Sequence, residues 1–135
     1  SHSWAVAIFS MLAKKRKPIT VFGDGNQIRD FTHVSDIAES VVRSIDKDST
    51  NGQFFNSGTG KPTKVNDIVK YVFENIEEVP IQYKPHPPGD PFGGYAENTL
   101  MKKLLDWEPE YTLQNGIKEY FEWLDDNEHL IPEWT

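Results

Sequence analysis

The sequence predicts an α/β fold in which helices alternate along the chain with a few short strands. Two observations support this class. Apolar residues recur at helical spacing in several stretches, and short β-branched or aromatic runs separate those stretches. Since about three short strands make a poor independent sheet, we expect some of them to complete a sheet whose remainder lies outside this sequence.

Helices are expected wherever apolar side chains recur every three or four residues. Pro18 should end the first helix, Ser35 is a plausible N-cap for the second, and Lys64 or Asn66 lies near the start of the third. The expected helices cover residues 4–17, 37–45, 65–76, 98–105 and 113–124.

The strands are expected at 19–22, 53–56 and 80–83, which are rich in β-branched and aromatic residues. Tight turns should follow the first two of them, because residues 23–26 and 57–60 are rich in Gly, Asp, Asn and Ser. Residues 85–91 carry four prolines, so they should form a stiff loop that is neither helical nor part of a central strand.

Composition excludes several classes of protein. The 135 residues suit one domain, and the absence of cysteine rules out disulfides and cysteine metal sites. A formal net charge of −7 argues against broad nucleic-acid binding, and no apolar run is long enough to span a membrane. We therefore expect a cytoplasmic protein, and a small anionic ligand remains compatible with this charge.

Three segments contain short motifs that together resemble those of a known protein family. The first is the run from Val21 to Ile37, which contains Gly-Asp-Gly, Arg-Asp-Phe and Val-Ser-Asp. The second is Asn56-Ser57-Gly58-Thr59-Gly60, followed by a helical pattern. The third combines Pro88-Gly89-Asp90 with Ala96 and the run Lys103-Leu104-Leu105-Asp106-Trp107-Glu108-Pro109.

These segments, in this order, resemble the C-terminal, substrate-binding part of extended short-chain dehydrogenases. The NAD-dependent epimerase/dehydratase family, with its UDP-glucose 4-epimerases, belongs to that group. The likeness covers about residues 19–124. It implies that residues 1–135 are a single substrate-binding domain fragment, with the Rossmann core largely missing and the N-terminal NAD-binding domain absent.

The resemblance also implies substrate-binding residues. The family's equivalent of Arg29 contacts a nucleotide diphosphate, and a guanidinium can hold two phosphate oxygens at once. Gly23 and Gly25 allow the backbone to turn sharply before it. Asp90 lies in the family's Pro-Gly-Asp loop, but Pro87 stands where the family usually has a second Arg. Lys84 or His86 would have to substitute for that Arg.

Other readings of these polar residues stay open. Arg29 could instead pair with Asp30 or Asp36, and Asp36 could serve the first turn of its helix. We assign no catalytic residue, and we expect His33 to be structural. The four histidines show no metal-ligand spacing, so no metal site is predicted.

The catalytic motifs of the family are not found in this sequence. No glycine-rich turn opens a βαβ unit, and neither Tyr71 nor Tyr120 is followed by Lys at the fourth position. The resemblance therefore implies a fragment that binds a UDP- or dTDP-sugar but is not catalytic alone. NAD would be bound by the missing domain of a parent enzyme, which is expected to be a homodimer. No cofactor is expected for the fragment.

Two hypotheses remain as alternatives to the interpretation as an enzyme fragment. A non-catalytic binding or regulatory relative on the same scaffold is favoured by Pro87. A protein-interaction module would use the amphipathic first helix. The sequence does not choose between sugars, between bases, or between epimerase, dehydratase and decarboxylase.

Overall fold

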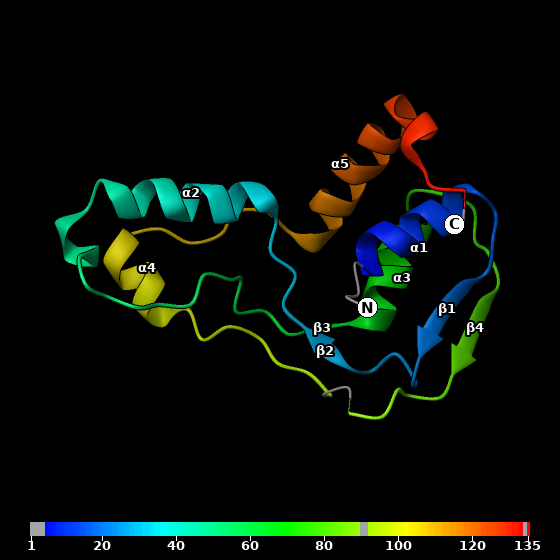
Figure 1. Cartoon of the computed structure of the whole chain (residues 1–135), viewed down its shortest axis with the longest axis horizontal. Helices are drawn as coiled ribbons and strands as arrows, with labels where there is room; N and C mark the ends of the chain where they lie inside the picture. The colour runs from blue at the N-terminus through cyan, green and yellow to red at the C-terminus, as the bar shows by residue number, and fades with distance from the viewer. Residues whose placement is uncertain (1–4, 90–91, 134) are drawn as a thin grey trace.

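The computed structural model describes residues 5–89, 92–133 and 135. Its helices gather at two ends of an elongated molecule (Figure 1). One end holds α1, α3, α5 and a pair of strands, and the other holds α2 and α4. Extended segments run between the two ends, so residues distant in sequence lie side by side in the middle.

The main hydrophobic core lies at the first end. Helices α1 (Ala5–Lys14), α3 (Val65–Phe73) and α5 (Leu113–Asp126) pack around it, and β1 (Ile19–Phe22) lies beside them. Its buried side chains are Phe9, Ala13, Ile19, Val21, Val65, Ile68, Val69, Val72, Ile117 and Phe121.

Strand β1 pairs in parallel with β4 (Ile81–Lys84), so Ile19 is opposite Ile81 and Phe22 is opposite Lys84. A parallel pair needs a long crossover connection, which is here the whole stretch from the end of β1 to the start of β4. Because the strands are parallel, the chain leaves both of them at the same edge.

A second strand pair lies in the middle of the molecule. Strand β2 (Ile28–Arg29) is antiparallel to β3 (Thr63–Lys64), with Arg29 opposite Thr63. Strand β3 leads directly into α3, whose N-cap is Lys64, and Asp67 Oδ2 accepts a hydrogen bond from the Lys64 amide at 3.0 Å. The entry into α3 therefore fixes the partner strand of Arg29.

The other end of the molecule is formed by α2 (Val34–Ile45) and α4 (Thr99–Leu105), with a short 3-10 turn, η1 (Asp48–Thr50), between them in space. Met101 and Leu105 of α4 are fully buried. A further 3-10 turn, η2 (Glu128–Leu130), follows α5. All the helices predicted from apolar spacing are present.

Two local predictions are wrong, and two short strands were missed. Residues 53–56 form no strand in the described structure, because no neighbouring strand pairs with them. The N-cap of α2 is His33 rather than Ser35, and the His33 Nδ1 atom accepts a hydrogen bond from the Ser35 amide at 3.3 Å. Strands β2 and β3 were missed because each is two residues long and has no apolar alternation.

None of the helices in the described ranges has both the length and the apolar character needed to cross a membrane.

The core predicts a clear stability effect at Ile68, which is fully buried in α3. We expect Ile68→Ala to lower the free energy of unfolding by about 2–5 kcal/mol, because it removes buried methyl groups and leaves a cavity. Ile45→Ala is the matched control, since Ile45 is 78% exposed; it should change stability by less than about 0.5 kcal/mol. Urea unfolding followed by circular dichroism measures both. Equal effects would contradict the assignment of the core.

Candidate functional site

The turn after β1 is shaped by two glycines with left-handed backbone angles, Gly23 at φ +73° and Gly25 at φ +75°. The side chain of Asn66 fills the space beside Gly25, and a Cβ there would lie 1.9 Å from Asn66 Oδ1. Asn66 also donates to the Asp24 carbonyl at 3.0 Å. Any side chain at position 25 would therefore displace the contact that holds the turn against α3.

The turn is also tied by its own acidic residue. The Asp24 carboxylate accepts hydrogen bonds from the amide and the side chain of Asn26, at 2.9 and 2.8 Å. These bonds stabilise the ionised form and hold the pKa of Asp24 below its ordinary value. The turn therefore keeps a fixed negative charge at neutral pH.

Parallel pairing brings the proline-rich loop to this turn. The amide of Gly23 donates to the Lys84 carbonyl at 2.8 Å. The His86 ring lies against Gly23, where a Cβ would be 2.8 Å from His86 Cδ2. The structure thus brings Gly23, Lys84 and His86 together, although their positions are about 60 residues apart along the chain.

Arg29 lies half-buried on β2, beside the far end of the same loop. Its Nη1 atom donates to the Ile28 carbonyl at 2.8 Å and lies 3.5 Å from the Phe92 carbonyl oxygen. The backbone of the loop runs along β2, because the Ile28 amide donates to the Phe92 carbonyl at 2.9 Å and the Gly94 amide donates to the Ile28 carbonyl at 3.3 Å. The segment that directly follows the Pro-Gly-Asp motif therefore lies at Arg29. Asp90 itself lies outside the described residues.

The carboxylate next to Arg29 is held by backbone amides. Asp30 accepts hydrogen bonds from the amides of Thr59 at 3.2 Å, Gly60 at 2.9 Å and Ala96 at 3.0 Å, and also from the Thr59 hydroxyl. Burial raises the pKa of Asp30, but the hydrogen bonds from Thr59, Ala96 and Gly60 outweigh burial, and the pKa lies below its ordinary value. Asp30 is thus a structural anion that joins three segments.

Asp36 and His33 are structural in the same sense. The Asp36 carboxylate accepts from the amides of Glu110 at 3.0 Å and Tyr111 at 3.1 Å, rather than from the first turn of its own helix. The His33 ring stacks on Tyr111 with ring centroids 3.8 Å apart, and its Nε2 atom lies 3.7 Å from Glu119 Oε1. The structure therefore gives His33 the structural role that the sequence predicts.

Sequence reasoning missed two polar residues beside the turn. Asn66 was considered only as a helix start, although its side chain supports Gly25. Gln27 is buried and donates to the Phe22 carbonyl at 2.7 Å, while its Oε1 atom is buried without a hydrogen-bond partner in the part of the chain that the structure describes. Only the position of Gln27 inside the first motif could have pointed to it.

A separate apolar groove lies between α1, the segment before α2, and α5. Its volume is about 550 Å³. It is lined by side chains that include Val6, Phe31, Val34, Tyr111 and Tyr120. None of the described residues predicted to bind substrate lines this groove. Burial raises the pKa of Tyr120.

Within the described ranges, no group of three or more His, Asp or Glu side chains is placed to hold a metal ion. The polar groups at the candidate site are instead the basic side chains of Arg29, Lys84 and His86, which lie beside the glycine turn and the loop after β4. Such a set suits a phosphate-bearing organic ligand.

Comparison with known protein families gives a match over most of the chain. The family model described as GDP-mannose 4,6 dehydratase matches residues 5–120. UDP-glucuronate 4-epimerase of Thermodesulfobacterium geofontis is 34% identical over 119 residues, which are 87% of this chain and 36% of that protein. UDP-glucose 4-epimerase of Bacillus subtilis is 32% identical over 84% of this chain and 36% of its own length.

Solved structures agree with the fold. UDP-glucose 4-epimerase of Thermotoga maritima, solved with UDP-glucose, superposes with a TM-score of 0.81 at 31% identity, over 91% of this chain and 40% of its own. UDP-glucuronic acid 4-epimerase of Bacillus cereus, solved with UDP-glucuronic acid and NAD, gives 0.84 at 23% identity over 91% and 40%. The chain thus spans about two fifths of the length of these relatives.

The Asp30 cluster predicts both a stability loss and a changed pH dependence. We expect Asp30→Asn to cost about 1–3 kcal/mol at pH 7, because an amide cannot accept all the hydrogen bonds that the carboxylate accepts. The folded-state pKa of Asp30 lies below its unfolded value of about 3.9, so the ionised carboxylate stabilises the fold above that value. This stabilisation is lost as pH falls through the lower, folded-state pKa.

Urea unfolding at pH 7 and at pH 3 checks this. The stability of Asp30→Asn should fall less between the two pH values than that of the unchanged protein. Asp126→Asn is the control, because Asp126 is exposed at the end of α5. The prediction is refuted if both variants show the same stability and the same pH dependence.

Proposed function

Because the chain belongs to the GDP-mannose 4,6 dehydratase family of NAD-dependent epimerases and dehydratases, we propose that it is the nucleotide-sugar-binding part of such an enzyme. In this proposal the chain holds the diphosphate of a UDP- or dTDP-sugar and is not catalytic alone. NAD would be held by a glycine-rich half that this sequence does not contain, and it would accept and return hydride there.

One observation carries this proposal. The chain leaves β1 and β4 at the same edge, and the loop from β4 continues past Gly23 to lie along β2 at Arg29. Two motifs that the sequence separates by about 60 residues therefore meet in one place. A diphosphate needs fixed positive charge and N–H donors at one point, and a half-buried guanidinium beside a glycine turn offers both.

The relatives support the ligand class. The Thermotoga epimerase was solved with UDP-glucose and the Bacillus cereus epimerase with UDP-glucuronic acid and NAD. Lys84, exposed at the end of β4, and His86, which lies against Gly23, flank the turn on the side of the missing second Arg. We propose that they complete the phosphate contacts. Lys84 would supply an ammonium and His86 an imidazole, in place of a second guanidinium that binds two oxygens. Asp90 is proposed as a further contact of the nucleotide.

A second function, a non-catalytic binding or regulatory relative, is favoured by Pro87 at the position where the family usually has that second Arg. It would use the same site without hydride transfer. A homodimeric parent and a cytoplasmic location also remain predictions.

The test is binding of UDP to the 135-residue chain, measured by isothermal titration calorimetry at low ionic strength. We expect Arg29→Ala to weaken binding about 10- to 100-fold, because a charge-assisted hydrogen bond contributes about 1.5–3 kcal/mol. Arg29→Lys should recover only part of this loss, since an ammonium cannot bind two oxygens in fork geometry.

Arg16→Ala is the matched control. Arg16 is exposed and forms a surface ion pair with Glu77 at 3.6 Å, so its loss removes one positive charge away from the site. If UDP binds equally to the unchanged chain, to Arg16→Ala and to Arg29→Ala, the assignment of the site is wrong.

A further inference from the structure

The chain contains two Asn-Gly pairs, and the structure places them in very different surroundings. Asn51-Gly52 lies in the turn after η1, and Asn115-Gly116 lies in the first turn of α5. Asparagine is a thermolabile residue. In an Asn-Gly pair the following backbone nitrogen can attack the side-chain amide, because glycine has no side chain that hinders the approach. The dipeptide is the same at both places, so a difference in reactivity between them comes from the fold.

The turn at Asn51 leaves the attacking nitrogen without a hydrogen-bond acceptor. Asn51 has φ −59° and ψ 123°, and Gly52 has φ +70°, which are the angles of a type II turn. The Gln53 amide closes this turn by donating to the Thr50 carbonyl at 3.0 Å. The Gly52 amide donates no hydrogen bond to any group in the part of the chain that the structure describes.

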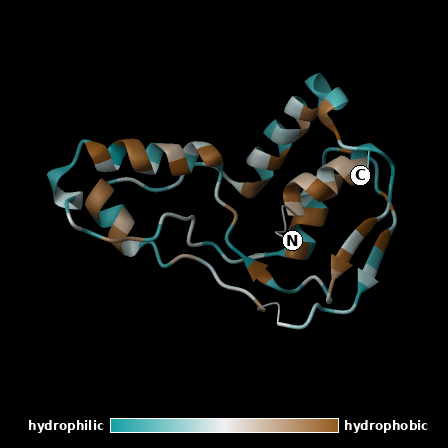
Figure 2. Ribbon diagram, viewed as in Figure 1, coloured by the Kyte–Doolittle hydropathy of each residue, from teal (hydrophilic) through white to brown (hydrophobic). Residues whose placement is uncertain are grey.

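The same turn lies open to solvent. Asn51 and Gly52 are both exposed, and a Cβ at Gly52 would have nothing within 4 Å beyond its chain neighbours. Figure 2 shows mainly hydrophilic residues in the chain that follows α2. The Asn51 side-chain amide makes a long hydrogen bond, to Asp48 Oδ1 at 3.4 Å. The peptide group between Asn51 and Gly52 can therefore rotate toward the side chain without breaking buried contacts.

The second pair is protected by its helix. The Gly116 amide donates to the Thr112 carbonyl at 3.0 Å, and the Asn115 amide donates to the Thr112 hydroxyl at 3.1 Å. Helical hydrogen bonds hold the backbone nitrogen away from the preceding side chain. Ile117, the next residue, is fully buried in the main core. Attack at Asn115 therefore requires this turn of the helix to unfold locally.

We propose that Asn51 is a site of spontaneous deamidation and that Asn115 is protected from it. The Gly52 nitrogen attacks Asn51 Cγ and forms a C–N bond, while the bond from Cγ to Nδ2 breaks. Ammonia leaves with the proton that the Gly52 nitrogen gives up. Water then opens the five-membered succinimide ring at either carbonyl, which gives isoaspartate or aspartate at position 51. The reaction is intramolecular, so the nucleophile is already beside its target.

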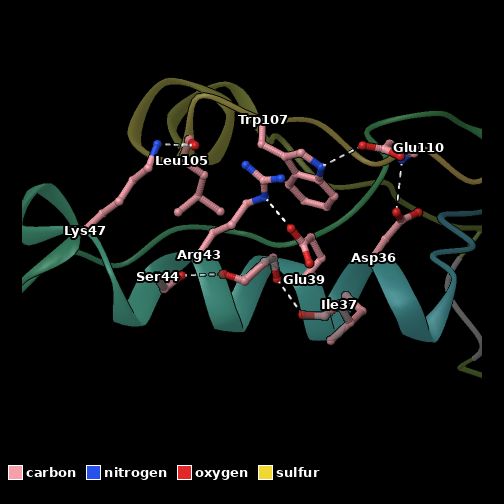
Figure 3. Close-up of polar contacts among 10 residues, drawn as sticks. Asp36, Ile37, Glu39, Arg43, Ser44, Lys47, Leu105, Trp107 and Glu110 are labelled. Carbon is pink, nitrogen blue, oxygen red and sulfur yellow. Dashed lines mark hydrogen bonds and ion pairs between the residues drawn. The ribbon is translucent and has the colours of Figure 1, made fainter.

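The modification acts on the attachment of α4. The Lys47 ammonium donates to the Leu105 carbonyl at the end of that helix (Figure 3), and the Ser49 hydroxyl donates to the carbonyl before it at 3.3 Å. Deamidation replaces the Asn51 amide, which donates to Asp48, by a carboxylate that repels Asp48. The turn then opens, and the hold of this loop on α4 weakens.

Peptide mapping by mass spectrometry, after incubation of the 135-residue chain at mildly alkaline pH, measures conversion at both asparagines. We expect Asn51 to convert at least about tenfold faster than Asn115 in the folded chain, because a helical amide is released only by local opening. In a denaturing concentration of urea the two sites should convert at nearly equal rates. An isoaspartate-specific carboxyl methyltransferase should label position 51, since opening of the ring at the backbone carbonyl gives that isomer.

Gly52→Ala and Asn51→Gln are the matched variants. Gly52→Ala places a methyl group beside the attacking nitrogen and should slow conversion at Asn51 without changing it at Asn115. Asn51→Gln keeps an amide but removes the route through a five-membered ring, so position 51 should stay intact. The proposal is overturned if Asn51 stays intact in the folded chain while it converts in urea. Equal conversion of Asn51 and Asn115 in the folded chain would overturn it as well.

Hydrogen exchange tests the effect on α4. Deamidation adds one negative charge, so ion-exchange chromatography separates converted from unconverted chains. The amides of α4 should exchange faster in the converted fraction, because the loop that holds the end of the helix has loosened. Asn51→Gln, incubated in the same way, should show no such change. Equal exchange of α4 in the two fractions would overturn the proposed effect on this helix.

Discussion

The middle of the molecule depends on one carboxylate, that of Asp30. It accepts hydrogen bonds from the turn at Thr59 and Gly60 and from Ala96, and so it joins β2 to two segments that come much later in the chain. These segments have little apolar surface to bury, so hydrophobic packing alone does not fix where they lie. Because Arg29 precedes Asp30 directly, the same carboxylate also holds the backbone that carries the guanidinium. Catalytic chemistry is not needed to explain an aspartate at this position.

The Asp36 carboxylate plays the same structural role at the other end of the molecule. It binds two amides in the connection between α4 and α5, and so it holds the polar side of α2 inward. The helix then has its valines and isoleucines on the outside. Burial of Asp36 and exposure of Val34, Val41, Val42 and Ile45 are therefore two consequences of one orientation of the helix.

The sequence predicted the helices well because their periodicity is local, and it predicted β1 and β4 from β-branched residues. It failed at residues 53–56 because a strand exists only with a partner, and propensity says nothing about whether the partner is present. The N-cap prediction failed because His33 is an uncommon cap, while Ser35 is a usual one. Gly23, Lys84 and His86 were predicted separately from motifs. Their meeting depends on the parallel register of β1 and β4, which no local pattern encodes. Gln27 and Asn66 were missed because their roles come from tertiary contacts.

The acidic charge of the chain does not conflict with an anionic ligand. At physiological ionic strength charges are screened over about 8 Å, so a ligand responds mainly to the groups beside it. Two carboxylates in this region, those of Asp24 and Asp30, each accept hydrogen bonds from N–H donors of the protein, which offset their negative charge where they lie. The cations Arg29 and Lys84 and the imidazole of His86 are carried by segments that meet at one edge of the parallel strands. A net charge of −7 therefore describes the surface as a whole, while the sign of the potential at this edge is set by which side chains the fold places there.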